Sequence, residues 1–197
     1  MMTLCMDTSQ KYLVLALIKN NEVIASKETI CFKQQSETIF PELITLCEEA
    51  NCSPQDIDQL VVTKGPGSYT GVRIAMTIAK VFCAMKNVPC FTLGSLQLIA
   101  GKRDCFAMLD ARSHRAYLGQ YRVGKCIGNL GVYTIEEIKE IVAGHDVVGD
   151  ASLLGMEDSY PNLAAAFLEL KDEWEKVENI HCLVPEYLKS QEEYLVK

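Results

Sequence analysis

The sequence predicts an α/β protein made of two packed lobes, with the boundary near residue 100. The main observation is that the order strand, strand, strand, helix, strand occurs twice along the chain. Each copy opens with an apolar run that ends on an aspartate, Asp7 in TLCMD and Asp110 in CFAMLD, 103 positions apart. That period is far too long for a solenoid. We therefore expect a lobe over residues 1–100 and a second, smaller lobe over 101–197 with a C-terminal helix and tail.

The elements of the first copy follow from the spacing of apolar residues. Short turns separate MTLCM, YLVLALI and VIASKETICF, which is typical of an antiparallel meander. Helical periodicity then predicts a helix over 36–50, with Ser36 as its N-cap and Asn51 beyond its end. DQLVVTK predicts a strand, GPG a turn and 71–86 a helix, before the strand PCFTL and a short helix at SLQLIA.

The second copy repeats this order after Asp110. RAYLGQYRV and KCIGNLGVYT predict two strands, TIEEIKEIVAG a helix and HDVVGD a strand. An amphipathic helix is predicted at roughly 162–176. Two readings of the repeat stay open, an internal duplication and a chance similarity of two α/β segments.

Charge is distributed unevenly along the chain. The net charge is −7, and residues 157–197 alone sum to −6. The 45 residues between Asp58 and Asp104 contain no acid but six basic residues: Lys64, Arg73, Lys80, Lys86, Lys102 and Arg103. This basic island indicates either a buried segment with few exposed positions or a surface that meets an anion or an acidic partner. The acidic total disfavours RNA binding by the chain alone.

Several classes of protein are excluded by composition. No run of eighteen apolar residues is present, so we expect no membrane span, and the N-terminus does not resemble a signal peptide. The nine cysteines include no CxxC pair, which favours free thiols in a reducing cytoplasm. Because the ligand spacings of zinc sites are missing, we expect no metal site.

The GPGSYTG segment stands between a strand and a helix, where phosphate loops occur. It matches neither GxxxxGK[ST] nor GxGxxG, since no lysine follows Gly71 and Thr70 replaces the third glycine. Two alternatives remain, an anion site and plain capping of the helix by Ser68 and Thr70. The candidate residues beside a nucleotide or anion are Asp7, Gly65, Gly67, Ser68, Thr70, Arg73 and Asp110.

The helix at 71–86 is apolar on nearly every side. Its polar residues Arg73, Thr77 and Lys80 form one narrow stripe. Small residues recur every four positions, at Gly71, Ala75, Ala79 and Cys83. This seam would let another backbone come close, so we expect either the second lobe or another chain to cover it. Together with the helix at 36–50 it could form half of an intermolecular bundle.

Catalytic motifs are missing. GxSxG and HExxH are absent, and DARSHR is interpreted as a solvated hairpin turn. Asp7 and Asp110 could hold a metal–nucleotide complex, as paired aspartates do in two-lobed ATPases. The loop DTSQK lacks the glycine that lets backbone approach a phosphate, which argues against ATP binding by this chain alone. We therefore assign no catalytic residue.

Several of these segments together resemble the TsaB (YeaZ) proteins of bacteria. They are DTS, GPGSYTGVRIAMTIAK, GSLQLIA, DARSHRAY and VPEYLK, and the similarity covers essentially the whole chain. The resemblance implies two ribonuclease-H-like lobes of the actin-like ATPase (ASKHA) type. It also implies a role in making threonylcarbamoyladenosine in tRNA, as a non-catalytic scaffold.

The resemblance implies particular partners as well. The chain would pair with the catalytic TsaD subunit, joined by the ATPase TsaE. A further possibility is a homodimer when alone, since the same apolar helices could pair with themselves when TsaD is absent. The chain would need no cofactor of its own, and it would reach tRNA only through the complex. Binding of ATP or ADP at the interface with its partners stays an open alternative. The implied surface lies on the helices at 36–50 and 71–86: Ile39, Leu43, Leu46, Gly71, Arg73, Ala75, Met76, Ala79, Lys80 and Cys83. Ala79→Glu or Ala75→Arg is then expected to abolish pairing and leave the monomer folded.

The chain departs from the family around the first long helix. Relatives often carry histidine where this chain has Gln34, Gln35 and Ser36, and SETIFPELITLCEEA lacks the histidine pair with which TsaD binds metal. Metal-dependent transfer is therefore not expected. The rival hypothesis is a self-sufficient ATP-dependent kinase or hydrolase that uses Asp7 and Asp110.

Overall fold

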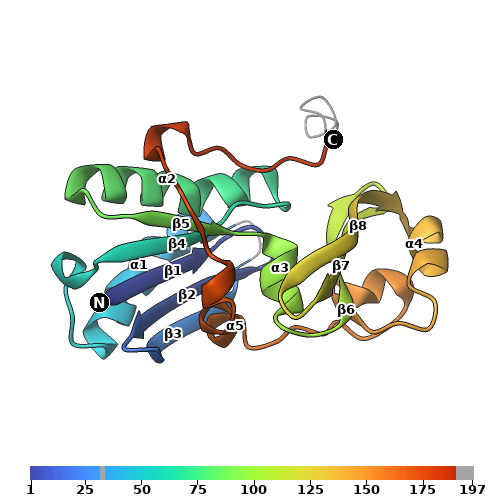
Figure 1. The fold of residues 1–197 in the computed structure, drawn as a ribbon, viewed down its shortest axis with the longest axis horizontal. Coiled ribbons are helices and arrows are strands. Elements are labelled where there is room, and N and C mark those ends of the chain that lie inside the picture. The colour runs from blue at the N-terminus through green and yellow to red at the C-terminus, as the bar shows by residue number, and fades with distance from the viewer. Residues whose placement is uncertain (32–33, 190–197) are drawn as a thin grey trace.

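The computed structural model describes residues 1–31 and 34–189, which form two mixed β-sheets with helices on their faces (Figure 1). The first sheet has the order β10-β5-β4-β1-β2-β3 and the second β8-β7-β6-β9. The strands are β1 Met2–Asp7, β2 Tyr12–Lys19, β3 Glu22–Ile30, β4 Gln59–Thr63, β5 Cys90–Leu93, β6 Cys105–Arg112, β7 Arg115–Arg122, β8 Lys125–Thr134, β9 Val147–Gly149 and β10 Glu175–Lys176. The predicted α/β class is confirmed.

The two sheets share one strand arrangement. β3-β2-β1-β4 in the first sheet corresponds to β8-β7-β6-β9 in the second. In each, the first strand pairs antiparallel with the second and parallel with the strand that follows the helix. The repeated order of elements predicted from the sequence is therefore confirmed, and the second sheet is the smaller.

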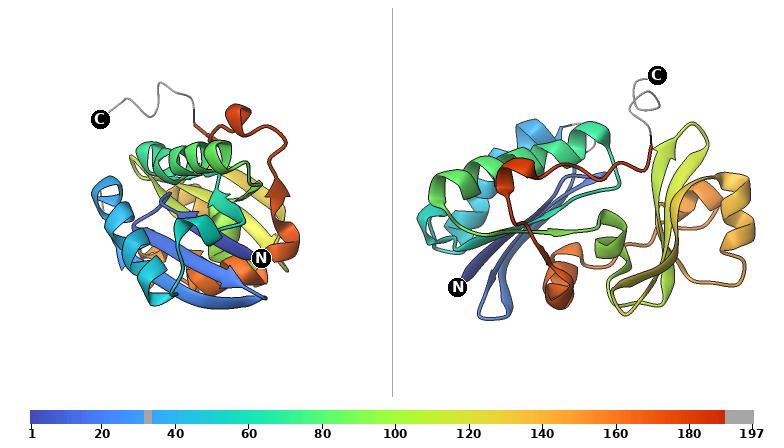
Figure 2. Two further views of the ribbon diagram at one scale, coloured as in Figure 1. Left: turned by 90° about the vertical axis from the view of Figure 1, so that its left-hand side faces the viewer. Right: turned by 45° about the horizontal axis from the view of Figure 1, so that its top comes forward.

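Helices cover the sheets in layers (Figure 2). α1 (Gln35–Glu49) and α2 (Tyr69–Lys86) pack on one face of the first sheet. α3 (Ser95–Ala100) and α5 (Leu163–Glu169) cover its other face, and their core continues into the second sheet. α4 (Ile135–Ile141) lies on the far face of the second sheet. One apolar core therefore joins the two sheets.

The C-terminal part of the chain departs from the expected boundary. Although 101–197 was expected to form the second lobe, α5 packs on β2 and β3, and β10 pairs with β5 of the first sheet. The helix predicted at 162–176 ends at Glu169. The buried side of α5, with Leu163 and Phe167, joins the core between the sheets, and β10 covers an edge that β5 would expose. The assignment of α5 and β10 to the second lobe was therefore wrong.

The starts of the two long helices were predicted with different success. Ser68 caps α2, because its hydroxyl accepts a hydrogen bond from the Gly71 N–H, as predicted. Thr70 lies inside the first turn and is not the cap. α1 begins at Gln35, earlier than predicted, and its N-cap residue is Gln34 rather than Ser36. The Gln35 amide is buried and donates to the Gln10 carbonyl, which fixes this start.

Candidate functional site

Asp7 ends β1 inside the protein, with no exposed surface. Its Oδ1 accepts hydrogen bonds from the Ser9 N–H at 2.8 Å and the Thr63 hydroxyl at 2.5 Å. Its Oδ2 accepts one from the Gln10 amide at 3.0 Å. Both carboxylate oxygens therefore hold the loop that follows β1. In this structure Asp7 does not face an open site.

That loop lies directly on the start of α2. The Ser68 N–H donates to the Ser9 carbonyl at 2.7 Å, and the Thr8 hydroxyl donates to the Gly71 carbonyl at 2.6 Å. The chain's own backbone therefore occupies the place beside the helix N-terminus where a phosphate would bind.

Two glycines of the predicted anion site make this contact fit. A Cβ at Gly67 would lie 2.4 Å from the Ser9 carbonyl oxygen, and one at Gly71 would lie 2.2 Å from that of Thr8. Any side chain at either position would push the loop away from the helix. The glycines of GPGSYTG thus serve close backbone packing, which favours the capping alternative.

The basic island meets the chain's own acidic C-terminal segment. Residues 177–189, which we term the C-terminal strap, run along α2 toward the second sheet (Figure 1). Lys64 forms ion pairs with Glu175 at 2.6 Å and with Glu186 at 3.7 Å. Lys80 donates at 3.0 Å to two strap carbonyls, those of His181 and Leu183. Of the two interpretations of the basic island, a surface that meets an acidic partner fits best. That partner is the acidic C-terminal segment of the same chain.

Arg73 fixes the same strap at the other end of α2. Its Nε donates to the Tyr187 hydroxyl at 2.7 Å, and its guanidinium lies 4.0 Å from the centre of the Tyr69 ring. The Tyr69 and Tyr187 rings stack at 5.2 Å. Gly65, with φ +109°, allows the strap to pass, because a Cβ there would lie 2.6 Å from the Glu186 carbonyl oxygen. Arg73 and Lys80, expected at a partner interface, are thus engaged within the chain.

Asp110 lies near the end of β6, beside the β6–β7 hairpin turn. Its carboxylate accepts hydrogen bonds from the Arg112 backbone and guanidinium, both at 2.7 Å. Residues 112–114 have positive φ and are largely exposed, which confirms the solvated turn predicted for DARSHR. Each aspartate therefore bonds its own neighbours. The arrangement gives no support to a metal–nucleotide site shared by Asp7 and Asp110.

An ion-pair cluster missed by the sequence joins the two sheets. Lys11, in the loop after β1, lies 2.5 Å from Asp158 and 3.3 Å from Asp150. Asp150 also accepts a hydrogen bond from the Asp110 N–H, at the end of the second sheet. Burial alone would raise the pKa of the Asp158 carboxyl, but the hydrogen bond from Lys11 opposes it and the pKa is lowered. The sequence offered no signal for a contact between residues so far apart in the chain.

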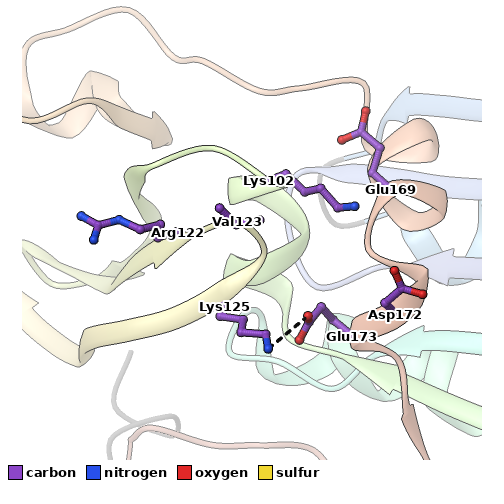
Figure 3. Close-up of a pocket in the computed structure, with 7 residues that line it drawn as sticks. All are labelled: Lys102, Arg122, Val123, Lys125, Glu169, Asp172 and Glu173. Atoms are coloured by element: carbon purple, nitrogen blue, oxygen red, sulfur yellow. Dashed lines mark ion pairs between the residues drawn. The ribbon is translucent and has the colours of Figure 1, made fainter.

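A cavity of about 430 Å³ opens where α5 and the residues after it meet the β7–β8 turn (Figure 3). Lys125 and Glu173 face each other across it, at 3.8 Å. Three basic and three acidic side chains balance its charge. All seven lining residues lie outside the predicted site: Lys102, Arg122, Val123, Lys125, Glu169, Asp172 and Glu173.

The small-residue seam of α2 faces the chain's own sheet. Ala75, Ala79 and Cys83 have at most 3% of their surface exposed and pack on the first sheet. Further residues predicted at the interface are also buried: Ile39, Leu46, Gly71 and Met76. Leu43 is half-buried at the edge of the same core. The expectation that these residues meet a partner is corrected, because the chain's own fold covers them.

Two pairs of exposed apolar residues lie on the outer sides of α1 and α2. Phe40 and Ile44 of α1 are 58% and 62% exposed, and Val81 and Met85 of α2 are 55% and 82% exposed. Each pair is spaced i, i+4 and therefore shares one side of its helix. We term these four residues the docking face. Because α2 is apolar on nearly every side, the sequence could not show which side the sheet would leave exposed.

The comparisons with known proteins agree with this fold. Residues 21–162 match the family model of TsaD, described as tRNA N6-adenosine threonylcarbamoyltransferase. The chain is 30% identical to the Bacillus subtilis tRNA threonylcarbamoyladenosine biosynthesis protein TsaB, over 98% of this chain and 96% of that protein. The chain belongs to the TsaB (YeaZ) family. An Escherichia coli TsaB is 29% identical over 62% of this chain and 55% of its own length.

Solved structures show the same fold for this TsaB-family chain. A Pseudomonas aeruginosa protein with similarity to peptidase YEAZ aligns with TM-score 0.78 and 21% identity, over 95% of this chain and 99% of that one. YeaZ from Pseudomonas aeruginosa aligns with TM-score 0.73 and 20% identity, with the same coverage. The α/β fold with mixed sheets is thus confirmed as YeaZ-like. The finer expectation of two ribonuclease-H-like lobes of the actin-like type stays a prediction.

No helix within 1–31 and 34–189 is long and apolar enough to cross a membrane. In the same part of the chain, no three His, Cys, Asp or Glu side chains gather in a group that could hold a metal ion.

Proposed function

We propose that this chain is a non-catalytic partner subunit in the synthesis of N6-threonylcarbamoyladenosine in tRNA. In this proposal it docks on a TsaD-type catalytic subunit through Phe40, Ile44, Val81 and Met85, and a TsaE-type ATPase joins the pair. The observation that carries the proposal is the docking face itself, on a chain whose family is defined by this modification.

The energetics of the docking face favour a protein partner. Full burial of one large apolar side chain contributes about 1.5–3 kcal/mol, so four of them can anchor an interface. Because the chain matches a TsaD family model, a TsaD-type partner would present helices related to α1 and α2. Two such helix pairs facing each other form a four-helix contact with approximate twofold symmetry. The same argument allows a homodimer when the partner is absent.

The chemistry is assigned to the partner because this chain's own candidate groups are engaged. The Asp7 carboxylate holds its loop, and that loop fills the space beside the start of α2. In the proposal, this chain requires no cofactor and reaches tRNA only through the complex. The alternative, a self-sufficient ATP-dependent kinase or hydrolase, would need this loop to move off α2.

Reconstitution tests the proposal. The chain is combined with the TsaD-type and TsaE-type subunits of its own organism, ATP, unmodified tRNA and an activated threonylcarbamoyl donor, and threonylcarbamoyladenosine in tRNA is measured by nucleoside mass spectrometry. We expect modification only when all three proteins are present, and no ATP turnover by this chain alone. Modification that is unchanged when this chain is omitted would contradict the proposal. ATP turnover by the purified chain alone would favour the enzyme.

A further inference from the structure

Two cysteines meet where α1 ends. Cys47 lies in the last turn, and Cys52 follows five residues later. The Cys52 N–H donates to the Cys47 carbonyl at 3.0 Å, and the Asn51 N–H donates to the Glu48 carbonyl at 3.1 Å. Asn51 between them has φ +47°. This pair of hydrogen bonds around a left-handed residue is the Schellman motif, which a contact between the side chains at these two positions frequently accompanies.

The backbone geometry brings the two cysteines within bridging range. Standard bond lengths and the 3.0 Å hydrogen bond keep the Cα atoms of Cys47 and Cys52 less than about 7 Å apart. Disulfides span Cα distances of roughly 4.4–6.8 Å. The two side chains also influence each other. Burial, followed by the neighbouring Cys52 side chain, raises the pKa of the Cys47 thiol to about 11.

Accessibility separates this pair from a second pair of neighbouring thiols. Cys47 and Cys52 are both partly exposed. Cys83 of α2 and Cys90 of β5 also interact, and the Cys90 thiol lowers the pKa of Cys83. Each of these two is only 3% exposed and lies in the core of the first sheet. A dissolved oxidant can reach the first pair, whereas the second pair is shielded.

We propose that Cys47 and Cys52 are an oxidisable dithiol, a modification site that a low-molecular-weight disulfide converts into an intrachain disulfide. The Cys52 thiolate attacks one sulfur of the reagent and releases the other half as a thiolate. The Cys47 thiolate then attacks the Cys52 sulfur and releases the second half. The protein loses two electrons and two protons, and one reagent disulfide becomes two thiols.

The order of attack follows from the environment of Cys47. Only the thiolate is nucleophilic, and the raised pKa leaves Cys47 mostly protonated at neutral pH. Cys47 is therefore assigned the second, intramolecular step, where its proximity to Cys52 compensates for its low thiolate fraction. Closure of the disulfide is expected to accelerate as pH rises toward 11.

Oxidised glutathione followed by peptide mapping tests the proposal. The folded chain is treated at pH 8, denatured, alkylated with iodoacetamide and digested with trypsin. Residues 34–64 form one tryptic peptide that contains Cys47 and Cys52 and no other cysteine. We expect this peptide to lose two hydrogens and to take no alkyl group. Two alkyl groups on it, or glutathione on both cysteines, while exposed Cys126 and Cys182 are modified, would overturn the proposal.

Two controls define the site. Cys52→Ser removes the bridge, so peptide 34–64 should keep a single cysteine that is alkylated or carries glutathione. Cys83 and Cys90 lie in separate tryptic peptides, 81–86 and 87–102, so a bridge between them would link two peptides. We expect both to be alkylated after denaturation. A Cys83–Cys90 link formed as fast as the first bridge would refute the role of accessibility.

Discussion

At the scale of single residues, the site is defined by the hydrogen bonds that the buried Asp7 carboxylate accepts. The Asp7 carboxylate accepts three hydrogen bonds in a place closed to solvent. A buried group of this kind stabilises the fold when fully paired and costs free energy when any partner is lost. Asp7 resembles a catalytic aspartate by its position at a strand end. By its contacts it is a structural residue.

Asp7→Asn tests this assignment. The amide would place an N–H₂ group where a carboxylate oxygen accepts a hydrogen bond, so one buried donor would lose its partner. We expect the free energy of unfolding, measured by urea denaturation, to fall by about 2–3 kcal/mol. Asp110→Asn is the matched control and should change it by less than about 1 kcal/mol, because those hydrogen bonds are at the surface. Unchanged stability of Asp7→Asn would count against a structural role.

At the scale of elements, α2 has three different sides. Its small residues pack on the sheet, Arg73 and Lys80 hold the C-terminal strap, and Val81 and Met85 stay exposed. This division explains why so apolar a helix carries one narrow polar stripe. It also corrects the expected test of docking. Ala79→Glu would place a charge in the core of the first sheet and unfold the monomer rather than block a partner.

Arg73→Ala tests how the strap is held. Removing the guanidinium deletes the hydrogen bond to Tyr187 and the contact with the Tyr69 ring. We expect amide exchange within residues 180–189 to rise roughly tenfold, because both contacts that hold Tyr187 against α2 are weakened. Thr77→Ala, at an exposed position of the same helix, should leave that exchange unchanged. Equal exchange in both variants would show that the strap is held elsewhere.

At the scale of the whole molecule, one core and one ion-pair cluster join the sheets. Leu96 of α3 and Phe167 of α5 belong to a core that includes Val14 of the first sheet and Ala107 of the second. Lys11 adds a polar link through Asp150 and Asp158. The two sheets are therefore held together by burial and charge.

The sequence predicted what local periodicity encodes. The meander, α1, α2, the Ser68 cap and the repeated strand order all depend on neighbouring residues, and they are confirmed. The return of α5 and β10 to the first sheet depends on which apolar surfaces remain uncovered after folding. The docking face was missed for a related reason, since Val81 and Ala79 look equally apolar in a sequence. Only the position of the sheet separates them.

The central claim is that the outer sides of α1 and α2 bind a TsaD-type subunit, and light scattering coupled to size exclusion tests it most directly. The wild-type chain mixed with that subunit should elute as one heteromer. Ile44→Asp combined with Met85→Asp should remain folded and elute separately, with affinity lowered at least about thirtyfold. Ile127→Asp, an exposed apolar position on β8, should still bind. A heteromer that persists with the double variant would contradict the claim.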